Sequence, residues 1–131
     1  MKFLIDTHTF LWFVSGAENL SKKANEQIAN NDNQIFISIA SLWEMAIKNS
    51  LGKLDINGGY ETVINDVIAN DIEILAINFQ HTLIQNKLPF YHRDPFDRII
   101  ISQAIAEKID LISTDAIFDD YFKTELVKRI W

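Results

Sequence analysis

Short apolar runs alternate along the whole chain with longer segments in which apolar residues recur at helical spacing. The short runs are rich in β-branched and aromatic residues, which is typical of buried strands. They predict strands at residues 2–6, 34–38, 73–75, 110–114 and, as a last edge strand, 126–130. The segments between them predict helices over residues 7–14, 20–31, 39–53, 60–69, 79–86, from 95 onward, and 116–122.

Strands separated by helical segments imply βαβ crossovers. We therefore expect an α/β fold in which a mainly parallel sheet has helices on both faces, a three-layer α/β/α sandwich. In such sheets ligands bind at the carboxyl ends of the strands, near the point where the strand order reverses. Two predicted strands end in an aspartate, at Asp6 and Asp115. If these strands are neighbours, both carboxylates face the same crevice.

The composition fits one domain over residues 1–131, because 48% of the residues are hydrophobic and can form a core. There is no cysteine, which excludes disulfides and thiolate metal sites. No apolar run approaches the roughly 20 residues that a membrane span needs, and Asp6 and His8 interrupt the first apolar run too early for a signal peptide. We expect a cytoplasmic protein with no membrane contact.

The net charge of −6 argues against broad, charge-driven binding of nucleic acid. An acidic protein that acts on phosphates needs metal ions at its acidic cluster, or a local basic rim. The sign of the charge therefore constrains the mechanism but does not decide the function.

Four acidic residues each have a plain structural explanation. Asp97 follows Pro95 in the first turn of a predicted helix, where Asp94 is the expected N-cap and an acid is favourable near the helix N-terminus. Glu44 lies one turn before Lys48 and can form an exposed i,i+4 pair. Asp6 and Asp115 can cap the helices that follow their strands.

Taken together, however, these carboxylates come from four distant segments and would meet at one edge of the sheet. Clustered carboxylates raise each other's pKa unless cations bind among them. Mg²⁺ and Mn²⁺ prefer oxygen ligands and would activate water for attack on a phosphate. Zinc is less favoured, because the three histidines lack the spacing of a zinc motif.

The motifs LIDTHTFLW, SLWEMAIK, HRDPFDRIIISQA and LISTD, in this order, resemble those of the PIN-domain ribonucleases. The resemblance is closest to the VapC-like toxins of toxin–antitoxin pairs and covers nearly the whole chain. It implies an α/β/α sandwich that binds Mg²⁺ or Mn²⁺ and cleaves RNA. Carried over by position, the catalytic and metal-binding quartet falls on Asp6, Glu44, Asp97 and Asp115. Asp119 is a possible fifth acid, or part of a solvated helix face.

The resemblance also implies less certain roles and partners. Thr7 and Thr114 could bond metal waters or phosphate, with helix capping as the alternative. Arg98 could line the cleft against RNA phosphates, together with Lys48, Lys53, Lys87, His92 and Arg93, with scattered solubilising charges as the alternative. A cognate antitoxin and a second copy of the chain are the implied protein partners. The aromatic residues that could serve such an interface, or simply the core, are Phe10, Trp12, Phe13 and Trp43.

Two other classes of protein remain open. A haloacid-dehalogenase-like phosphatase would need a D-x-D pair at the first strand, where this chain has Asp6-Thr7-His8, and a receiver domain would need paired acids there. A PIN-like module that holds RNA or a partner without cutting is the second alternative. The intact quartet argues against an inert module.

Overall fold

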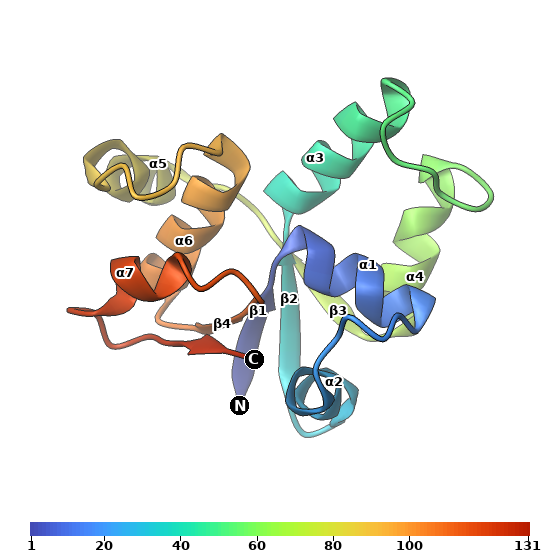
Figure 1. Cartoon of the computed structure of the whole chain (residues 1–131), viewed down its shortest axis with the longest axis horizontal. Helices are drawn as coiled ribbons and strands as arrows, with labels where there is room; N and C mark the ends of the chain where they lie inside the picture. Colours follow the sequence, from blue (N-terminus) through green and yellow to red (C-terminus); the bar gives the residue numbers. More distant parts are fainter.

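The computed structural model describes residues 1–131 and contains one five-stranded sheet in the order β3-β2-β1-β4-β5 (Figure 1). The strands are β1 (Lys2–Ile5), β2 (Gln34–Ser38), β3 (Ile72–Leu75), β4 (Asp110–Ile112) and β5 (Arg129–Ile130). All four pairs of neighbouring strands are parallel. The predicted α/β fold is confirmed, and the expected last strand is present as only two residues at the edge.

The helices occupy the connections between the strands, as the spacing predicts. Figure 1 shows α5, α6 and α7 on one side of the sheet and α1, α2 and α4 on the other. Their bounds are α1 Thr7–Ser15, α2 Lys22–Ala29, α3 Ile39–Ser50, the 3₁₀ turn η1 Tyr60–Thr62, α4 Val63–Ala69, α5 Phe79–Lys87, α6 Pro95–Glu107 and α7 Phe118–Phe122. No helix is long and apolar enough to cross a membrane.

Most of the expected helices differ slightly in their bounds from those observed; α2, for example, is Lys22–Ala29 where residues 20–31 were predicted, and α7 begins at Phe118 and not at residue 116. Helix α3 ends at Ser50 and does not continue to residue 53, since Gly52 adopts a positive φ of 71° that closes the turn after it. The segment predicted as one helix over residues 60–69 begins with the 3₁₀ turn η1. These differences lie at helix ends, where sequence patterns are least informative.

Each face of the sheet has its own apolar core, because side chains alternate along a strand. In β1, Phe3 and Ile5 face the core beneath α1, α2, α3 and α4, whereas Leu4 faces the core beneath α6 and α7. Helix α3 contacts both α1 and α6. Because β1 is buried on both faces, it holds the residue that follows it, Asp6, in a fixed position.

The strand order reverses between β1 and β4. The chain runs from β1 outward to β2 and β3, then crosses to β4 on the opposite side of β1. Ile5 pairs with Ile112 in the register of these two strands. Asp6 follows β1 directly and Asp115 lies shortly after β4, so both acids leave the sheet at its switch point.

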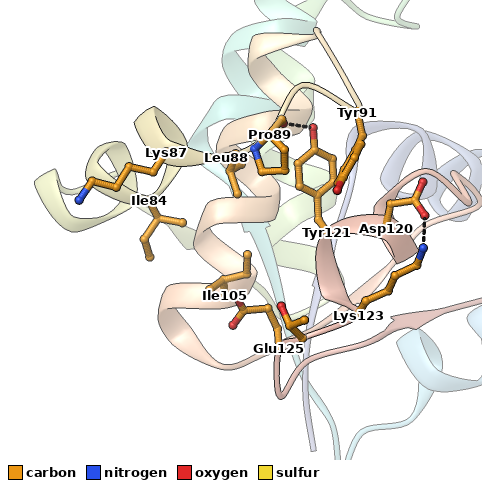
Figure 2. Close-up of a pocket in the computed structure, with 11 residues that line it drawn as sticks. Ile84, Lys87, Leu88, Pro89, Tyr91, Ile105, Asp120, Tyr121, Lys123 and Glu125 are labelled. Atoms are coloured by element: carbon orange, nitrogen blue, oxygen red, sulfur yellow. Dashed lines mark hydrogen bonds and ion pairs between the residues drawn. The ribbon is translucent and has the colours of Figure 1, made fainter.

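A separate surface groove of about 490 Å³ lies beside the loop between α5 and α6 (Figure 2). Its walls include Leu88, Pro89 and Tyr91 of that loop and Tyr121 of α7. None of the four candidate acids lines this groove. The ring of Tyr121 therefore has the groove on one side, while its hydroxyl bonds the carbonyl of Pro89 at 2.7 Å.

Candidate active site

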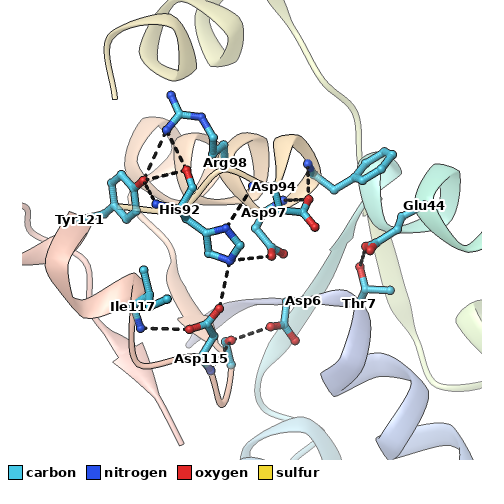
Figure 3. A network of polar contacts seen from close by, with 12 residues as sticks. Asp6, Thr7, Glu44, His92, Asp94, Asp97, Arg98, Asp115, Ile117 and Tyr121 are labelled. Carbon is cyan, nitrogen blue, oxygen red and sulfur yellow. Dashed lines mark hydrogen bonds and ion pairs between the residues drawn. The ribbon is translucent and has the colours of Figure 1, made fainter. Parts of the chain in front are cut away.

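Asp6 is fixed at the end of β1 by two different kinds of hydrogen bond. Its Oδ1 accepts from the main-chain N–H of Thr9 at 3.0 Å and so caps α1, as the alternative explanation expected. Its Oδ2 accepts from the hydroxyl of Ser113, which follows β4 (Figure 3). Burial raises the pKa of the Asp6 carboxyl above its ordinary value, while the bonds from Ser113 and Thr9 act in the opposite direction.

Glu44 lies in the middle of α3 and is only 4% exposed. Its Oε1 accepts a 2.6 Å hydrogen bond from the hydroxyl of Thr7, and its Oε2 lies 2.7 Å from Nζ of Lys48. The expected i,i+4 pair therefore exists, but its interpretation as an exposed surface pair is wrong because the carboxylate is buried. Thr7 is a hydrogen-bond donor to this acid and not the cap of α1, which is Asp6.

Asp97 and Asp115 are brought together by His92. The Nε2 of His92 lies 3.0 Å from Oδ2 of Asp97 and 3.1 Å from Oδ2 of Asp115 (Figure 3). Each of these residues offers one ligand atom to a cluster in which all such atoms lie within 4.8 Å of one another. The other oxygen of Asp115 accepts from the N–H of Ile117 at 3.0 Å, a local bond that orients the carboxylate.

The pKa of Asp97 is affected by the other acidic residues of the site. Its pKa is raised to about 8, chiefly by burial and then by repulsion from Asp94, Asp6, Glu44 and Asp115. All members of the predicted quartet are thus near enough to act on one carboxyl group. The charge of Asp94 also acts on Asp97, but Asp94 itself is the N-cap of α6, where it accepts a hydrogen bond from the N–H of Phe96 at 2.8 Å.

The donor set fits a hard divalent cation. Carboxylate oxygens converge at the switch point, and their mutual repulsion raises the pKa of Asp97, which a bound cation would relieve. Asp97 and Asp115 belong to the 4.8 Å cluster with His92, whereas Asp6 lies beside it and Glu44 is held on α3 by Thr7 and Lys48 (Figure 3).

The expectation that Arg98 lines the cleft against RNA is wrong. Arg98 is 2% exposed, and its guanidinium donates to main-chain carbonyls of residues 85, 88, 89 and 92 at 2.8–3.2 Å. Successive helix residues point about 100° apart, so Arg98 turns away from the side of α6 that carries Asp97. Its guanidinium also lies 4.2 Å from the ring centroid of Phe90.

The remaining predicted residues have separate outcomes. Thr114 is exposed in the turn before Asp115. Asp119 is not a fifth acid of the site, because Arg129 binds both of its carboxylate oxygens at 3.0 Å. Among the aromatic candidates, Phe10 is fully buried in the core, whereas Trp43 is 60% exposed and lies edge-on to Phe96.

His92 is the residue whose place the sequence reasoning missed. It was expected only as one of several basic residues near the cleft, yet it lies between two of the four acids. The sequence feature that could have placed His92 in the site is its position two residues before Asp94, the N-cap of α6. A side chain there sits over the first turn of the helix, next to Asp97.

Comparisons with known proteins identify the family of the chain and its fold. The PIN domain family model matches residues 3–123. No curated protein matches the chain by sequence.

Solved structures share the fold at low sequence identity. A chain of VapBC2 from Rickettsia felis is 18% identical to this chain, with a TM-score of 0.71 over 98% of both chains. That structure is described as VapBC2 bound to a DNA fragment from its promoter. A chain of VapBC-5 from Mycobacterium tuberculosis is 14% identical with a TM-score of 0.66, over 98% of this chain and 97% of that one. A toxin–antitoxin complex from Klebsiella pneumoniae gives 19% identity and a TM-score of 0.62, over 95% and 93%. With the family model matching almost its full length, the chain belongs to the PIN domain family.

Proposed function

We propose that this protein is a Mg²⁺- or Mn²⁺-dependent endoribonuclease that acts in the cytoplasm as the toxin of a toxin–antitoxin pair. The observation that carries the proposal is the cluster of His92, Asp97 and Asp115, whose ligand atoms lie within 4.8 Å of one another, with Asp6 and Glu44 near enough to help raise the pKa of Asp97. A carboxylate cluster this crowded at a sheet switch point is a site for a divalent cation. Membership of the PIN family adds nuclease chemistry to that site.

The residues that would hold the ion are Asp97, Asp115 and Asp6, with Glu44 completing the acidic group. A bound Mg²⁺ or Mn²⁺ would lower the pKa of water and neutralise charge on the attacked phosphodiester. Burial and the neighbouring carboxylates raise the pKa of Asp97 to about 8 in the cation-free protein, and a bound cation would lower it by offsetting its neighbours' charge. Thr7 fixes the direction of Glu44 by its hydrogen bond.

Lys48 would provide a positive charge beside the acids. Its ammonium is partly exposed while it bonds the buried Glu44, and its pKa is raised by that bond and by the charge of Asp94 and Asp97. A cation in this place can attract an RNA phosphate toward an otherwise acidic cleft. Broad basic surfaces are not required, which agrees with the net charge of −6.

The protein partners of this proposal are an antitoxin and a second copy of the chain. Solved VapBC structures of the same fold are complexes, and one is described as a toxin–antitoxin complex. On this chain the exposed Trp43 and the adjoining Phe96 form one wall of an apolar groove between α3 and α6. An exposed apolar surface of this kind is typical of a protein contact. Light scattering of the purified chain tests the homodimer.

The enzymatic proposal is tested with the purified full chain and single-stranded RNA in Mg²⁺ or Mn²⁺. We expect cleavage that stops when the metal is removed with a chelator and that is absent in Asp6→Asn and Asp97→Asn. Asp66→Asn, which changes an exposed acid on α4, is the matched control and should cleave like the wild type. Full activity of both site variants would contradict the proposal.

The toxin part of the proposal needs a second experiment. Induced expression of the wild type should stop growth, whereas expression of Asp97→Asn should not. Wild-type protein that binds RNA without cutting it in either metal would favour the alternative of an inert PIN-like binding module. Wild-type protein that cuts RNA without stopping growth would contradict only the toxin role.

A further inference from the structure

The imidazole of His92 is held in place from several sides. Its main-chain N–H donates to the hydroxyl of Tyr121 at 2.8 Å, and its carbonyl accepts from Arg98 at 3.2 Å. The ring lies against Phe118, with 5.9 Å between the ring centroids. Its side chain is only 17% exposed. The buried Arg98 and Tyr121 thus fix the turn that carries this ring, and the ring is not free to swing into solvent.

The hydrogen bonds of the ring define its tautomer. The main-chain N–H of Asp94 lies 3.2 Å from Nδ1 of His92, and because an amide N–H can only donate, Nδ1 must accept. In the neutral ring the proton is therefore on Nε2. That nitrogen donates to Oδ2 of Asp115 at 3.1 Å, and Oδ2 of Asp97 lies 3.0 Å from it in a second polar contact. The contacts of both ring nitrogens are therefore consistent with the tautomer that carries its proton on Nε2.

This tautomer is the wrong one for direct metal ligation through Nε2. A histidine that ligates a metal usually donates its other ring N–H to a carboxylate, a carbonyl or water. The other nitrogen of His92 faces a donor, the Asp94 amide, so ligation would set two N–H groups against each other. The ring is arranged to give a hydrogen bond to the Asp115 carboxylate and not to bind a metal ion.

We propose that His92 is a positioning residue whose Nε2–H donates to Asp115 while its ring nitrogen stays in contact with Asp97, so that the two carboxylates lie side by side and bind a divalent cation together. The inference rests on the proposed metal site and adds to it the group that orients two of its ligands. Asp97 comes from the start of α6 and Asp115 from the turn after β4. The N–H of His92 between them offsets part of their repulsion, and both oxygens lie within one cluster with its Nε2 (Figure 3).

Two substitutions separate this role from a purely local one. His92→Gln places an amide N–H about where Nε2 is and keeps a donor for the carboxylates. His92→Asn places its amide near Nδ1, where its oxygen can accept from the Asp94 amide but no donor reaches the acids. A residue needed only to shape the turn would be replaced better by Asn than by Gln.

The readout is the affinity of the full chain for Mn²⁺, measured by calorimetry without RNA. We expect His92→Asn to bind Mn²⁺ about 10–100-fold more weakly than the wild type, which is typical for loss of a group that orients metal ligands. His92→Gln should recover most of the affinity. Equal or tighter binding by His92→Asn would overturn the inference, as would binding by His92→Gln that is no better than by His92→Asn.

Imidazole ¹⁵N spectra of the wild type test the inference even if His92→Asn does not fold. We expect the proton on Nε2 and a bare Nδ1, both without metal and with Mg²⁺. A proton on Nδ1, or a change of tautomer on adding Mg²⁺, would overturn the positioning role. Failure of the proposed function looks different: wild-type protein that binds metal but does not cleave RNA contradicts the nuclease proposal alone, and wild-type protein that binds no metal contradicts both.

Discussion

The hydroxyl of Thr7 donates a 2.6 Å hydrogen bond to Oε1 of Glu44, and so joins the first turn of α1 to the middle of α3. Thr7 follows Asp6, and Glu44 is buried and paired on its other oxygen with Lys48. The bond links two members of the acidic group through segments far apart in the chain. It holds the Glu44 carboxylate in a fixed position on the α3 side of the site.

Replacing Thr7 by valine should lower the free energy of unfolding by about 1–3 kcal/mol, because one oxygen of the buried Glu44 loses its donor. The measurement is urea unfolding of the metal-free chain. Thr7→Ser keeps the hydroxyl and should lose less. A loss in Thr7→Ser as large as that in Thr7→Val would contradict the assignment of the stability to the hydrogen bond.

Asp97→Asn should raise the free energy of unfolding of the metal-free protein by about 1–2 kcal/mol above pH 8, because it removes one charge from a group of mutually repelling carboxylates. Asp94→Ala, three residues away, should instead lower it by about 0.5–2 kcal/mol through loss of the α6 cap. A large loss in Asp97→Asn would mean that this acid mainly stabilises the helix start.

The stability of the metal-free protein should fall as pH rises from about 4 to about 8. Asp97 has a folded-state pKa of about 8 and that of Asp6 is also raised, so the folded chain binds more protons than the unfolded chain in this range. Each such group contributes a slope of at most about 1.4 kcal/mol per pH unit. Urea unfolding in a chelator at several pH values measures the slope.

Two comparisons identify the source of that slope. Asp97→Asn should show a shallower dependence on pH, because one of the groups responsible is gone. Saturating Mg²⁺ should oppose the trend, since a cation binds the deprotonated carboxylates and stabilises the folded chain more as pH rises. The same slope in wild type and Asp97→Asn would contradict the assignment to this residue.

Arg98→Met should lower the free energy of unfolding by at least about 3 kcal/mol, because four main-chain carbonyls lose their donor at once and the buried guanidinium is removed from its place. Arg93→Met changes an exposed arginine of the same motif and should stay within about 0.5 kcal/mol of the wild type. An Arg98 variant that unfolds normally but binds RNA poorly would restore the role in substrate binding.

The sequence by itself determined the fold class and much of its local chemistry. Apolar runs such as residues 34–38 and the spacing of apolar residues in the helices are local patterns, and they predict strands, helices and crossovers directly. The caps at Ser38 and Asp94 were predictable for the same reason, because a cap depends only on residues within one turn.

Only the tertiary structure decided which polar side chains face one another. Arg98 was expected in the cleft and is buried under a loop, Asp119 is paired with Arg129, and His92 lies between Asp97 and Asp115. These outcomes depend on the direction of a helix face and on the register of β1 against β4. Local patterns do not encode such relations, because the contacts join residues that packing alone brings together.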